Sequence, residues 1–263
     1  MVEAYTHMII RWRYAVLLLT VVMVMLAGYG GQKLSFSNDY RMFFGPDNPQ
    51  LLAFEEMQNT FNKTDNILFV ITPEDGKVFT RETLAVIQEI TEEAWQIPHS
   101  TRVDSITNYQ HTYAEEDDLI VDDLAPDPSV LTDEDLSKIQ FIAINEPIMV
   151  NRLISPDSKY TGVNVTIQLP GKTLDEVPQA VAYARGMKAK YLEKYPGIEI
   201  RLVGLTMMNN AFPEASQDDV QNLYPVALGF ILITLLLMLR GLSGTVTVLF
   251  MIVFSIMIAM GLA

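Results

Sequence analysis

Few residues in this sequence are of the types that carry out chemistry. Cysteine is absent, which excludes disulfides, thiolate nucleophiles and zinc sites built on thiolates. The three histidines, His7, His99 and His111, are scattered, and we interpret His99 and His111 as isolated surface residues. Glycine-rich phosphate loops, a nucleophile elbow and the HExxH zinc motif are all missing. The sequence therefore predicts no catalytic, cofactor-binding or metal-binding residue, and we expect a protein that is not an enzyme.

The densest group of ionisable side chains lies at residues 115–135, where ten of 21 residues are acidic and none is Lys or Arg. One interpretation is a calcium site built on Asp117, Asp118, Asp122 and Asp123. Their spacing does not match an EF-hand loop, and no glycine supplies its sharp turn. We favour a solvated connection interrupted by prolines, followed by a short helix that Thr132 caps.

Two apolar runs lie between residues 223 and 263, and only residues 240–244 divide them. As one helix they would extend about 60 Å, roughly twice a ~30 Å hydrocarbon core, so the chain must turn back. The turn belongs at Arg240, because an arginine at mid-bilayer costs about 2.5 kcal/mol or more and the neighbouring glycines permit a tight reversal. We predict membrane helices over 223–239 and 245–263, in preference to a buried core hairpin. Because the second run has no polar flank, we expect a chain truncated inside a larger membrane protein.

A third apolar run, residues 15–31, follows Arg11 and Arg13. It is at the short end for a spanning helix, and a cleaved signal peptide is the alternative. The run is longer than a usual signal core and stays apolar to its end, which favours a span. Arg11, Arg13 and Arg240 then share one face of the membrane, and the positive-inside rule makes that face cytoplasmic. We therefore expect residues 1–14 and the turn 240–244 in the cytoplasm of a multi-pass inner-membrane protein.

The segment between the first and second spans, residues 32–222, would then be extracytoplasmic. It carries 31 of the 32 acidic residues and 15 of the 18 basic ones, a net charge of −16. Such a domain should not bind nucleic acid, and an anionic membrane surface would repel it. The lipid bilayer is instead the partner of the three apolar runs.

This outer segment has the pattern of a mixed α/β domain. Alternating or apolar β-branched stretches predict strands over residues 66–72, 101–107, 160–169 and 198–203. Helical spacing predicts a helix over 80–95, and a capping box of Thr173 and Glu176 predicts the start of another that runs to 192. The order gives two β-α-β units, which favours a split β-α-β, ferredoxin-like sandwich inserted between the first two spans.

Three segments resemble a known family of membrane proteins. Residues 11–14 (RWRY) are similar to its entry segment, and residues 38–49 (NDYRMFFGPDNP) to the segment that leaves its first span. Residues 204–219 (GLTMMNNAFPEASQDD) resemble the connection into its second span. With the order of span, outer domain and two spans, these soft patterns look like the first part of a resistance-nodulation-division (RND) transporter, most similar to the MMPL group of predicted exporters. The resemblance covers essentially the whole chain.

The resemblance implies two repeats of six spans, each with an outer porter domain after its first span, driven by protons. The remaining spans and the second repeat would be partners, and a homo-oligomer is compatible with the family. Its proton relay uses acidic residues of the fourth span. No Asp, Glu, Lys, Arg or His lies inside the three runs here, so the sequence assigns no relay residue.

Other readings of the same layout stay open. Chemoreceptors and sensor kinases also place an outer domain between two spans, but a charged signalling helix follows their second span. Here five residues separate the second run from the third, which favours a transporter over a membrane-anchored sensor. A sterol-sensing type of membrane domain and an RND-type component of protein secretion share parts of this architecture and remain alternatives.

A transporter of this kind needs a path for its substrate. Without catalytic groups or converging charges, the outer domain should guide a hydrophobic or amphiphilic, lipid-like molecule. We expect the path to be lined by residues beside the first and second spans, where Met and Phe adapt to varied ligands. These residues are Phe43, Phe44, Met207, Met208 and Phe212. The alternative is that they only pack the domain against the membrane.

The topology leads to a first testable prediction. Single cysteines at Ser37, Ser129 and Ser243 in this cysteine-free chain should react differently with an impermeant maleimide in intact cells. We expect labelling at Ser37 and Ser129 and protection at Ser243, because the arginine positions place residues 32–222 outside. Labelling at Ser243 with protection at Ser129 would reverse the orientation.

Overall fold

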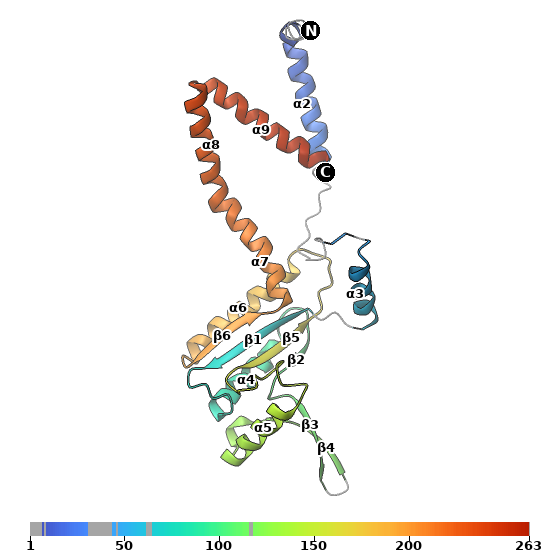
Figure 1. Ribbon diagram of the computed structural model, residues 1–263, viewed down its shortest axis with the longest axis vertical. Coiled ribbons are helices and arrows are strands. Elements are labelled where there is room, and N and C mark those ends of the chain that lie inside the picture. The colour runs from blue at the N-terminus through green and yellow to red at the C-terminus, as the bar shows by residue number, and fades with distance from the viewer. Residues whose placement is uncertain are drawn as a thin grey trace. The chain divides into compact units, whose positions relative to one another are not determined.

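The computed structural model describes residues 7, 9–30, 44–45, 47–61, 65–115 and 118–262. The chain divides into two compact units, one formed by Met1–Ser37 with Ala215–Ala263 and the other by Asn38–Glu214. Figure 1 labels the elements of both units, and each unit is described by itself.

A four-stranded sheet organises the unit Asn38–Glu214. Its strands are β1 (Asn66–Pro73), β2 (Ser100–Asp104), β5 (Thr161–Ile167) and β6 (Ile198–Val203). The order is β2-β5-β1-β6, and every neighbouring pair is antiparallel. Helix α4 (Arg81–Ala94) connects β1 to β2, and α6 (Glu176–Lys194) connects β5 to β6. The strands of each β-α-β unit are therefore separated by one strand of the other unit.

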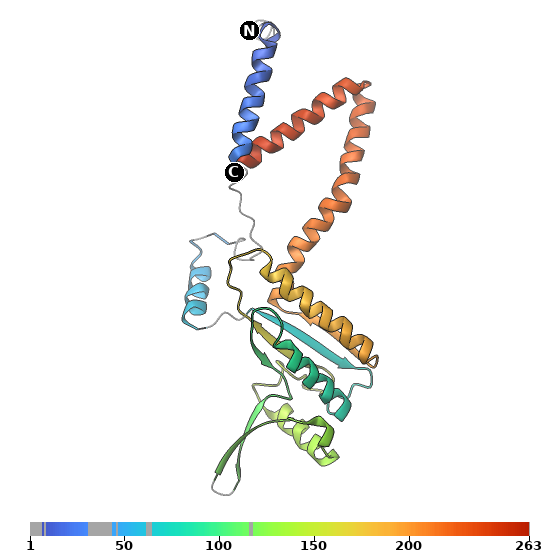
Figure 2. The same ribbon diagram turned by 180° about the vertical axis from the view of Figure 1, so that it is seen from behind.

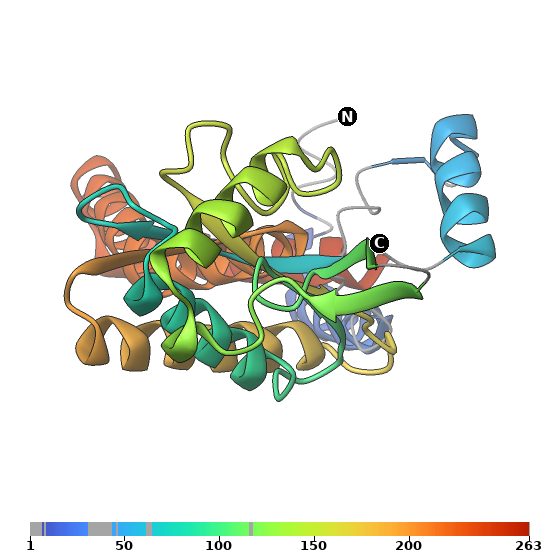
Figure 3. The same ribbon diagram turned by 90° about the horizontal axis from the view of Figure 1, so that it is seen from below.

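The central strand β1 shows why the sheet needs helices on one side. Its side chains alternate between buried and half-buried, with Ile67, Phe69 and Ile71 completely buried. On the same side, Val165 faces Ile67 and Val163 faces Phe69 in the antiparallel register with β5. Helices α4 and α6 cover this side, as Figures 2 and 3 show from two directions. The alternation seen in the sequence thus becomes a sheet with one face packed into the core.

Polar side chains fasten the two covering helices to each other. The Tyr191 hydroxyl of α6 donates to the Glu93 carboxylate (2.8 Å) and the Glu89 carbonyl (3.1 Å) of α4. Lys194 and the Tyr195 hydroxyl both donate to the Glu89 carboxylate, at 2.7 and 2.8 Å. Burial, and then the nearby Glu93 carboxylate, raise the pKa of Tyr191. Tyr191 therefore stays a protonated donor at neutral pH.

The start of α6 differs from the predicted capping box, in which Thr173 would cap the helix. The helix begins at Glu176, and its cap residue makes no side-chain hydrogen bond. The Glu176 carboxylate instead accepts from the backbone N–H groups of Gly171, Lys172 and Thr173, at 2.7, 2.8 and 3.0 Å. Burial opposes ionisation of this carboxyl, but the three N–H groups outweigh it and lower its pKa. The backbone N–H groups of the loop after β5 have no partner within a strand or helix and need an acceptor. Glu176 supplies that acceptor, so its carboxylate orders the loop as well as the start of the helix.

The acidic stretch forms regular structure where we expected a solvated connection. Residues of this stretch belong to a separate hairpin of β3 (Gln110–Glu115) and β4 (Asp118–Asp123). A 3-10 turn, η3 (Pro128–Val130), and α5 (Asp133–Asn145) follow. The predicted cap of α5 is confirmed, because Thr132 and Asp135 form a reciprocal capping box.

The calcium hypothesis can be compared with this hairpin. Asp118 and Asp122 lie four residues apart on β4, about 13 Å at ~3.3 Å per residue, too far to share one ion. Asp117 lies outside the described residues. Among the residues that are described, no group of three or more His, Asp or Glu side chains could hold a metal ion.

The other unit consists of apolar helices. They are α2 (Arg13–Gly30), which packs against α9 (Leu242–Leu262), and α8 (Tyr224–Leu239), which precedes α9. A π-helical turn, η4 (Asp219–Leu223), leads into α8, and the helical run Leu205–Leu239 has no break. By length and composition, this run and Leu242–Gly261 could each cross a membrane. The apolar part of α2, Arg13–Leu26, is shorter, so the first span stays a prediction.

The turn between α8 and α9 lies at Arg240, as predicted, but the backbone conformation that makes the turn differs from the prediction. We expected the glycines to permit the reversal, whereas Arg240 itself adopts the left-handed conformation (φ 48°). Its backbone N–H donates to the Leu236 carbonyl at 3.0 Å. A left-handed cap of this kind pairs a carbonyl that the ending helix would otherwise leave free. The turn is consequently shorter than residues 240–244, because α9 already begins at Leu242.

The junction after β6 gives a prediction about stability. Gly204 has φ +119°, and a Cβ atom there would lie 2.4 Å from the backbone oxygen of Asn66. We expect Gly204→Ala to lower the free energy of unfolding by about 1–3 kcal/mol, because both the backbone conformation and the contact become strained. Gly197→Ala is the matched control, since no atom lies within 4 Å of its added Cβ. Thermal unfolding of the whole chain in lipid nanodiscs, followed by circular dichroism, would measure both, and equal melting temperatures would contradict the prediction.

Candidate functional site

Three of the predicted path residues lie on one helix, α7 (Leu205–Asp218), which the sequence analysis treated only as a connection. The helix starts directly after β6 and Gly204. The Asn66 side chain holds this start, because its Oδ1 accepts from the Leu205 N–H at 3.2 Å while its Nδ2 donates to Asn164 at 2.7 Å. The end of the sheet therefore fixes where α7 begins.

The two sides of α7 have different surroundings. Thr206, Asn209 and Asn210 are buried, and Met207 packs partly buried against the core. Met208 and Phe212 are 43% and 54% exposed and lie four residues apart, so they are neighbours on one side of the helix. We call Met208 and Phe212 the α7 stripe. Of the three predicted residues on this helix, the structure brings these two together and turns Met207 toward the core.

A bidentate ion pair holds α7 against α6. Arg185 donates to both carboxylate oxygens of Glu214, at 2.7 and 2.8 Å, and Asn210 donates to the same carboxylate at 3.1 Å. The Arg185 guanidinium lowers the pKa of Glu214 and has its own pKa raised in return. Because both hydrogen bonds of the fork are made, the pair fixes the direction of α7 as well as its distance from α6.

The other predicted residues precede α3 (Pro49–Thr60). Phe43 lies outside the described residues. Phe44 is 48% exposed and lines a small apolar hollow of about 260 Å³. Its wall contains Gln50, Leu51 and Phe54 of α3. No α7 residue belongs to this wall, so the convergence of Phe44 with the α7 stripe remains a prediction.

Sequence reasoning missed the contribution of α3, although a signal was present. The Asn48 side chain accepts from the N–H groups of Gln50 and Leu51, and Pro49 occupies the first helical turn. An Asn-Pro pair before a run containing apolar residues is a usual start of a helix. That pair would have predicted a helix beginning at Pro49, although not its packing beside Phe44.

The three arginines from which we predicted the membrane topology do not line either of the hollows described for this chain. Arg13 begins α2, and its guanidinium lies 4.9 Å from the centre of the Tyr14 ring. Arg11 is exposed just before this helix, and Arg240 forms the turn between α8 and α9. The face of the membrane on which these residues lie remains a prediction.

The arrangement around α7 suits apolar contact better than catalysis. The buried Thr206 Oγ1 and Asn209 Oδ1 have no hydrogen-bond partner among the described residues, but they lie on the inward side of the helix. The outward side presents thioether and aromatic groups, which adapt to varied apolar surfaces. α8 follows without a break, has no buried residue and carries no charged side chain. These features describe an α/β domain that continues along the chain into a helix long and apolar enough to cross a membrane.

Comparison with known families identifies this class further. A family model described as the MMPL family matches residues 42–263. The chain therefore belongs to the MMPL family, whose members are RND-type membrane transporters. A comparison with curated proteins finds no match. The family predicted from soft sequence patterns is thus confirmed over most of the chain.

The ion pair on α7 leads to a prediction about pH. The pKa of Glu214 is lowered in the folded chain, so the stability that the pair contributes is present above the ordinary glutamate pKa of about 4.3 and is lost as pH falls through the lower folded value. Hydrogen-exchange protection of the α7 amides, corrected for intrinsic exchange, should stay constant between about pH 7 and 5 and fall below about pH 4. Glu214→Gln should lower this protection at neutral pH and remove most of its pH dependence.

The control for this variant is Glu199→Gln, which breaks the exposed pair with Arg201 on β6. It removes the same charge but should leave α7 protection unchanged. Equal effects of the two substitutions would show that the loss of α7 protection reflects net charge rather than the fork to Arg185.

Proposed function

We propose that this chain forms part of a proton-driven exporter of hydrophobic or amphiphilic, lipid-like molecules in the inner membrane. Membership of the MMPL family supports the transporter class. In this proposal residues 32–222 are an extracytoplasmic domain between the spans 15–31 and 223–239. The third span, 245–263, follows the cytoplasmic turn 240–244. The basic residues 11, 13 and 240 support this orientation through the positive-inside rule.

We also assign the outer domain to the split β-α-β, ferredoxin-like class of RND porter domains. The strand order β2-β5-β1-β6 supports this assignment, because each β-α-β unit leaves a gap that a strand of the other unit fills. The last strand of this sheet, β6, is followed at once by α7, so the sheet determines where the helix that carries the α7 stripe begins.

The observation that carries the export proposal is the α7 stripe itself. Met208 and Phe212 are large, apolar and about half exposed, although residues 32–222 carry a net charge of −16. Exposed apolar side chains on such a domain often mark a contact with a ligand or a membrane. We assign the stripe, with Phe44 and Phe43, to the path of the transported molecule.

The short turn after α8 supports a transporter over a sensor. Only Arg240 and Gly241 separate α8 from α9, which leaves no room for a signalling helix between them. α8 and α9 contain no Asp, Glu, Lys, Arg or His, so the proposal assigns no proton-relay residue to these helices. A role in protein secretion would use the same architecture but would not need the α7 stripe to bind small apolar molecules.

Transport measurements test the path. Cells that express the native reading frame should export a fluorescent hydrophobic probe such as Nile red, and a protonophore should stop this export. Met208→Ala, Phe212→Ala and Phe44→Ala should each slow export roughly fivefold, because truncation of a contact residue commonly costs about 1 kcal/mol or more. The amount of folded protein in the membrane should not change, since all three side chains are about half exposed.

Leu174→Ala provides the matched control, because Leu174 is 52% exposed in the loop before α6. It should export the probe at the rate of the unchanged protein. Normal export by all three path variants, or loss of folded protein in each of them, would show that these residues do not form the path.

A further inference from the structure

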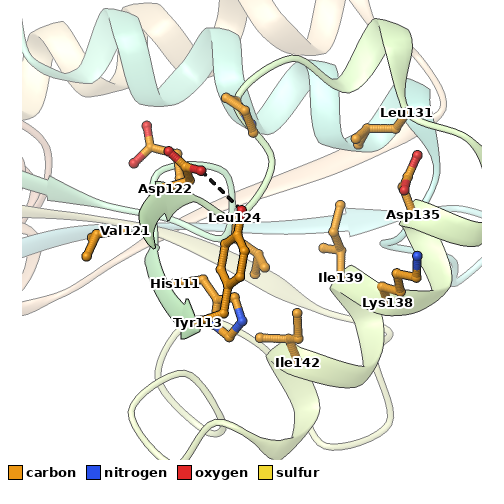
Figure 4. A pocket seen from close by; sticks show the side chains of 12 residues that line it. His111, Tyr113, Val121, Asp122, Leu124, Leu131, Asp135, Lys138, Ile139 and Ile142 are labelled. Atoms are coloured by element: carbon orange, nitrogen blue, oxygen red, sulfur yellow. Dashed lines mark hydrogen bonds between the residues drawn. The ribbon is translucent and has the colours of Figure 1, made fainter. Parts of the chain in front are cut away.

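A second hollow lies in the outer domain, away from α7 and α3. It is an open groove of about 730 Å³ between the hairpin β3–β4 and α5. Figure 4 shows Ile139 and Ile142 extending from α5 on one side, and His111, Tyr113 and Asp122 from the hairpin on the other. Pockets of about 300–1,000 Å³ are typical of sites for small organic ligands. The volume therefore suits a small molecule.

Hydrogen bonds support both walls of the groove. The backbone N–H groups of Leu124 and Ala125 donate to the carbonyls of Tyr109 and Thr107, which extends the pairing of the two hairpin legs beyond β3 and β4. At the start of α5, Arg81 of α4 donates to the Leu131 carbonyl. The same guanidinium pairs with Asp133 at 2.6 Å. These contacts order each wall separately, which lowers the entropic cost of binding between them.

The floor of the groove is apolar. Leu124 and Ile139 are at least nine-tenths buried, and the half-buried Leu131 and Ile142 extend the apolar surface along α5. Only small parts of Leu124 and Ile139 face the groove, and Val121, Leu131 and Ile142 present more apolar surface to it. A hydrocarbon chain of moderate length would gain free energy by displacing water from this floor.

The polar groups at the rim are mainly acidic. The lining includes Asp122, Asp123 and Asp135 but only one ammonium group, that of Lys138. Lys138 already pairs with Glu134 at 3.0 Å, and Asp135 is occupied by the Thr132 cap. The rim therefore favours a positive charge on the ligand.

The register of the hairpin places Asp122 beside two aromatic rings, which makes it the best position for a positive charge of the ligand. His111 lies directly opposite Asp122, and Tyr113 follows His111 by two residues, so all three side chains belong to the same side of the hairpin. The His111 and Tyr113 rings stack at 5.8 Å, and the Tyr113 hydroxyl donates to the Asp122 carboxylate at 3.4 Å. A carboxylate beside an exposed aromatic ring is the combination that recognises organic ammonium groups.

We infer that this groove binds a small amphiphilic organic cation, with its ammonium group at Asp122 and Tyr113 and its hydrocarbon tail on Leu124, Ile139 and Ile142. The inference rests on the groove alone and not on transport or its direction. The site is distinct from the α7 stripe, because no residue of the stripe lines the groove.

The test uses the whole chain in phosphatidylcholine nanodiscs with hexyltrimethylammonium as the probe. Methyl NMR of isoleucine should show shifts at Ile139 and Ile142 and none at Ile67 and Ile71 in the sheet core. The dissociation constant should be near or below about 1 mM, as expected for a ligand of about ten heavy atoms. Tetramethylammonium, which lacks the tail, should bind at least about tenfold more weakly. Hexanoate, with a tail of similar length and the opposite charge, should cause no shifts.

Two substitutions locate the charge. Asp122→Asn should raise the dissociation constant about threefold to fivefold, and Tyr113→Leu should raise it about threefold, because each removes one of the two interactions with the ammonium group. Asp118→Asn is the matched control. Asp118 lies on the same strand and the same side of the hairpin but does not line the groove. It should change binding less than twofold.

Several results would overturn the inference. Absence of shifts at Ile139 and Ile142 would show that the probe does not bind in the groove. Equal shifts with hexanoate would show that the groove has no preference for cations. Equal weakening by Asp118→Asn and Asp122→Asn would indicate only a general attraction to an acidic domain. The comparison of ligands uses the unchanged chain, so it remains decisive if a variant fails to fold.

Discussion

The antiparallel pairing of β1 with both β5 and β6 is the constraint on which the α/β unit Asn38–Glu214 depends. β1 comes first in the sheet along the chain, but its partners lie roughly a hundred residues or more later. Closing these long connections is entropically costly, and burial of the alternating apolar side chains of β1 and β5 offsets the cost. Once the three strands are paired, α4 and α6 must pack on the buried face, and the polar contacts of Tyr191 with α4 fix their alignment.

The same pairing determines where α7 begins in the chain. Asn66, at the start of β1, binds both Asn164 of β5 and the first N–H of α7. Gly204 lets the chain pass close to the Asn66 carbonyl as it leaves β6. A change in the sheet would therefore reach α7 through these contacts, and the Arg185–Glu214 fork would transmit it to α6.

Charge has two different roles in this chain. The net charge of −16 on residues 32–222 keeps the domain from anionic surfaces, while individual carboxylates have specific partners. Glu176 accepts from three N–H groups of a loop, Glu214 holds α7, and Asp135 accepts from Thr132 in the capping box of α5. Asp122 differs from these three carboxylates, because the structure gives it an aromatic neighbour at the rim of a groove. Composition alone could not separate these roles.

The sequence by itself determined the elements whose signal is local: the alternating strand β1, the helical spacing of α4, the Thr132 cap and the reversal at Arg240. It also determined the MMPL family, whereas the path assigned to Met208 and Phe212 remains a proposal. Only the tertiary structure decided that Met207 turns toward the core, that Leu51 and Phe54 accompany Phe44, that Glu176 serves a loop, and that the acidic stretch builds a hairpin against α5. The physical reason is that burial and hydrogen-bond satisfaction are set by residues distant in the chain. A short pattern can specify a strand or a helix but not which groups will surround it.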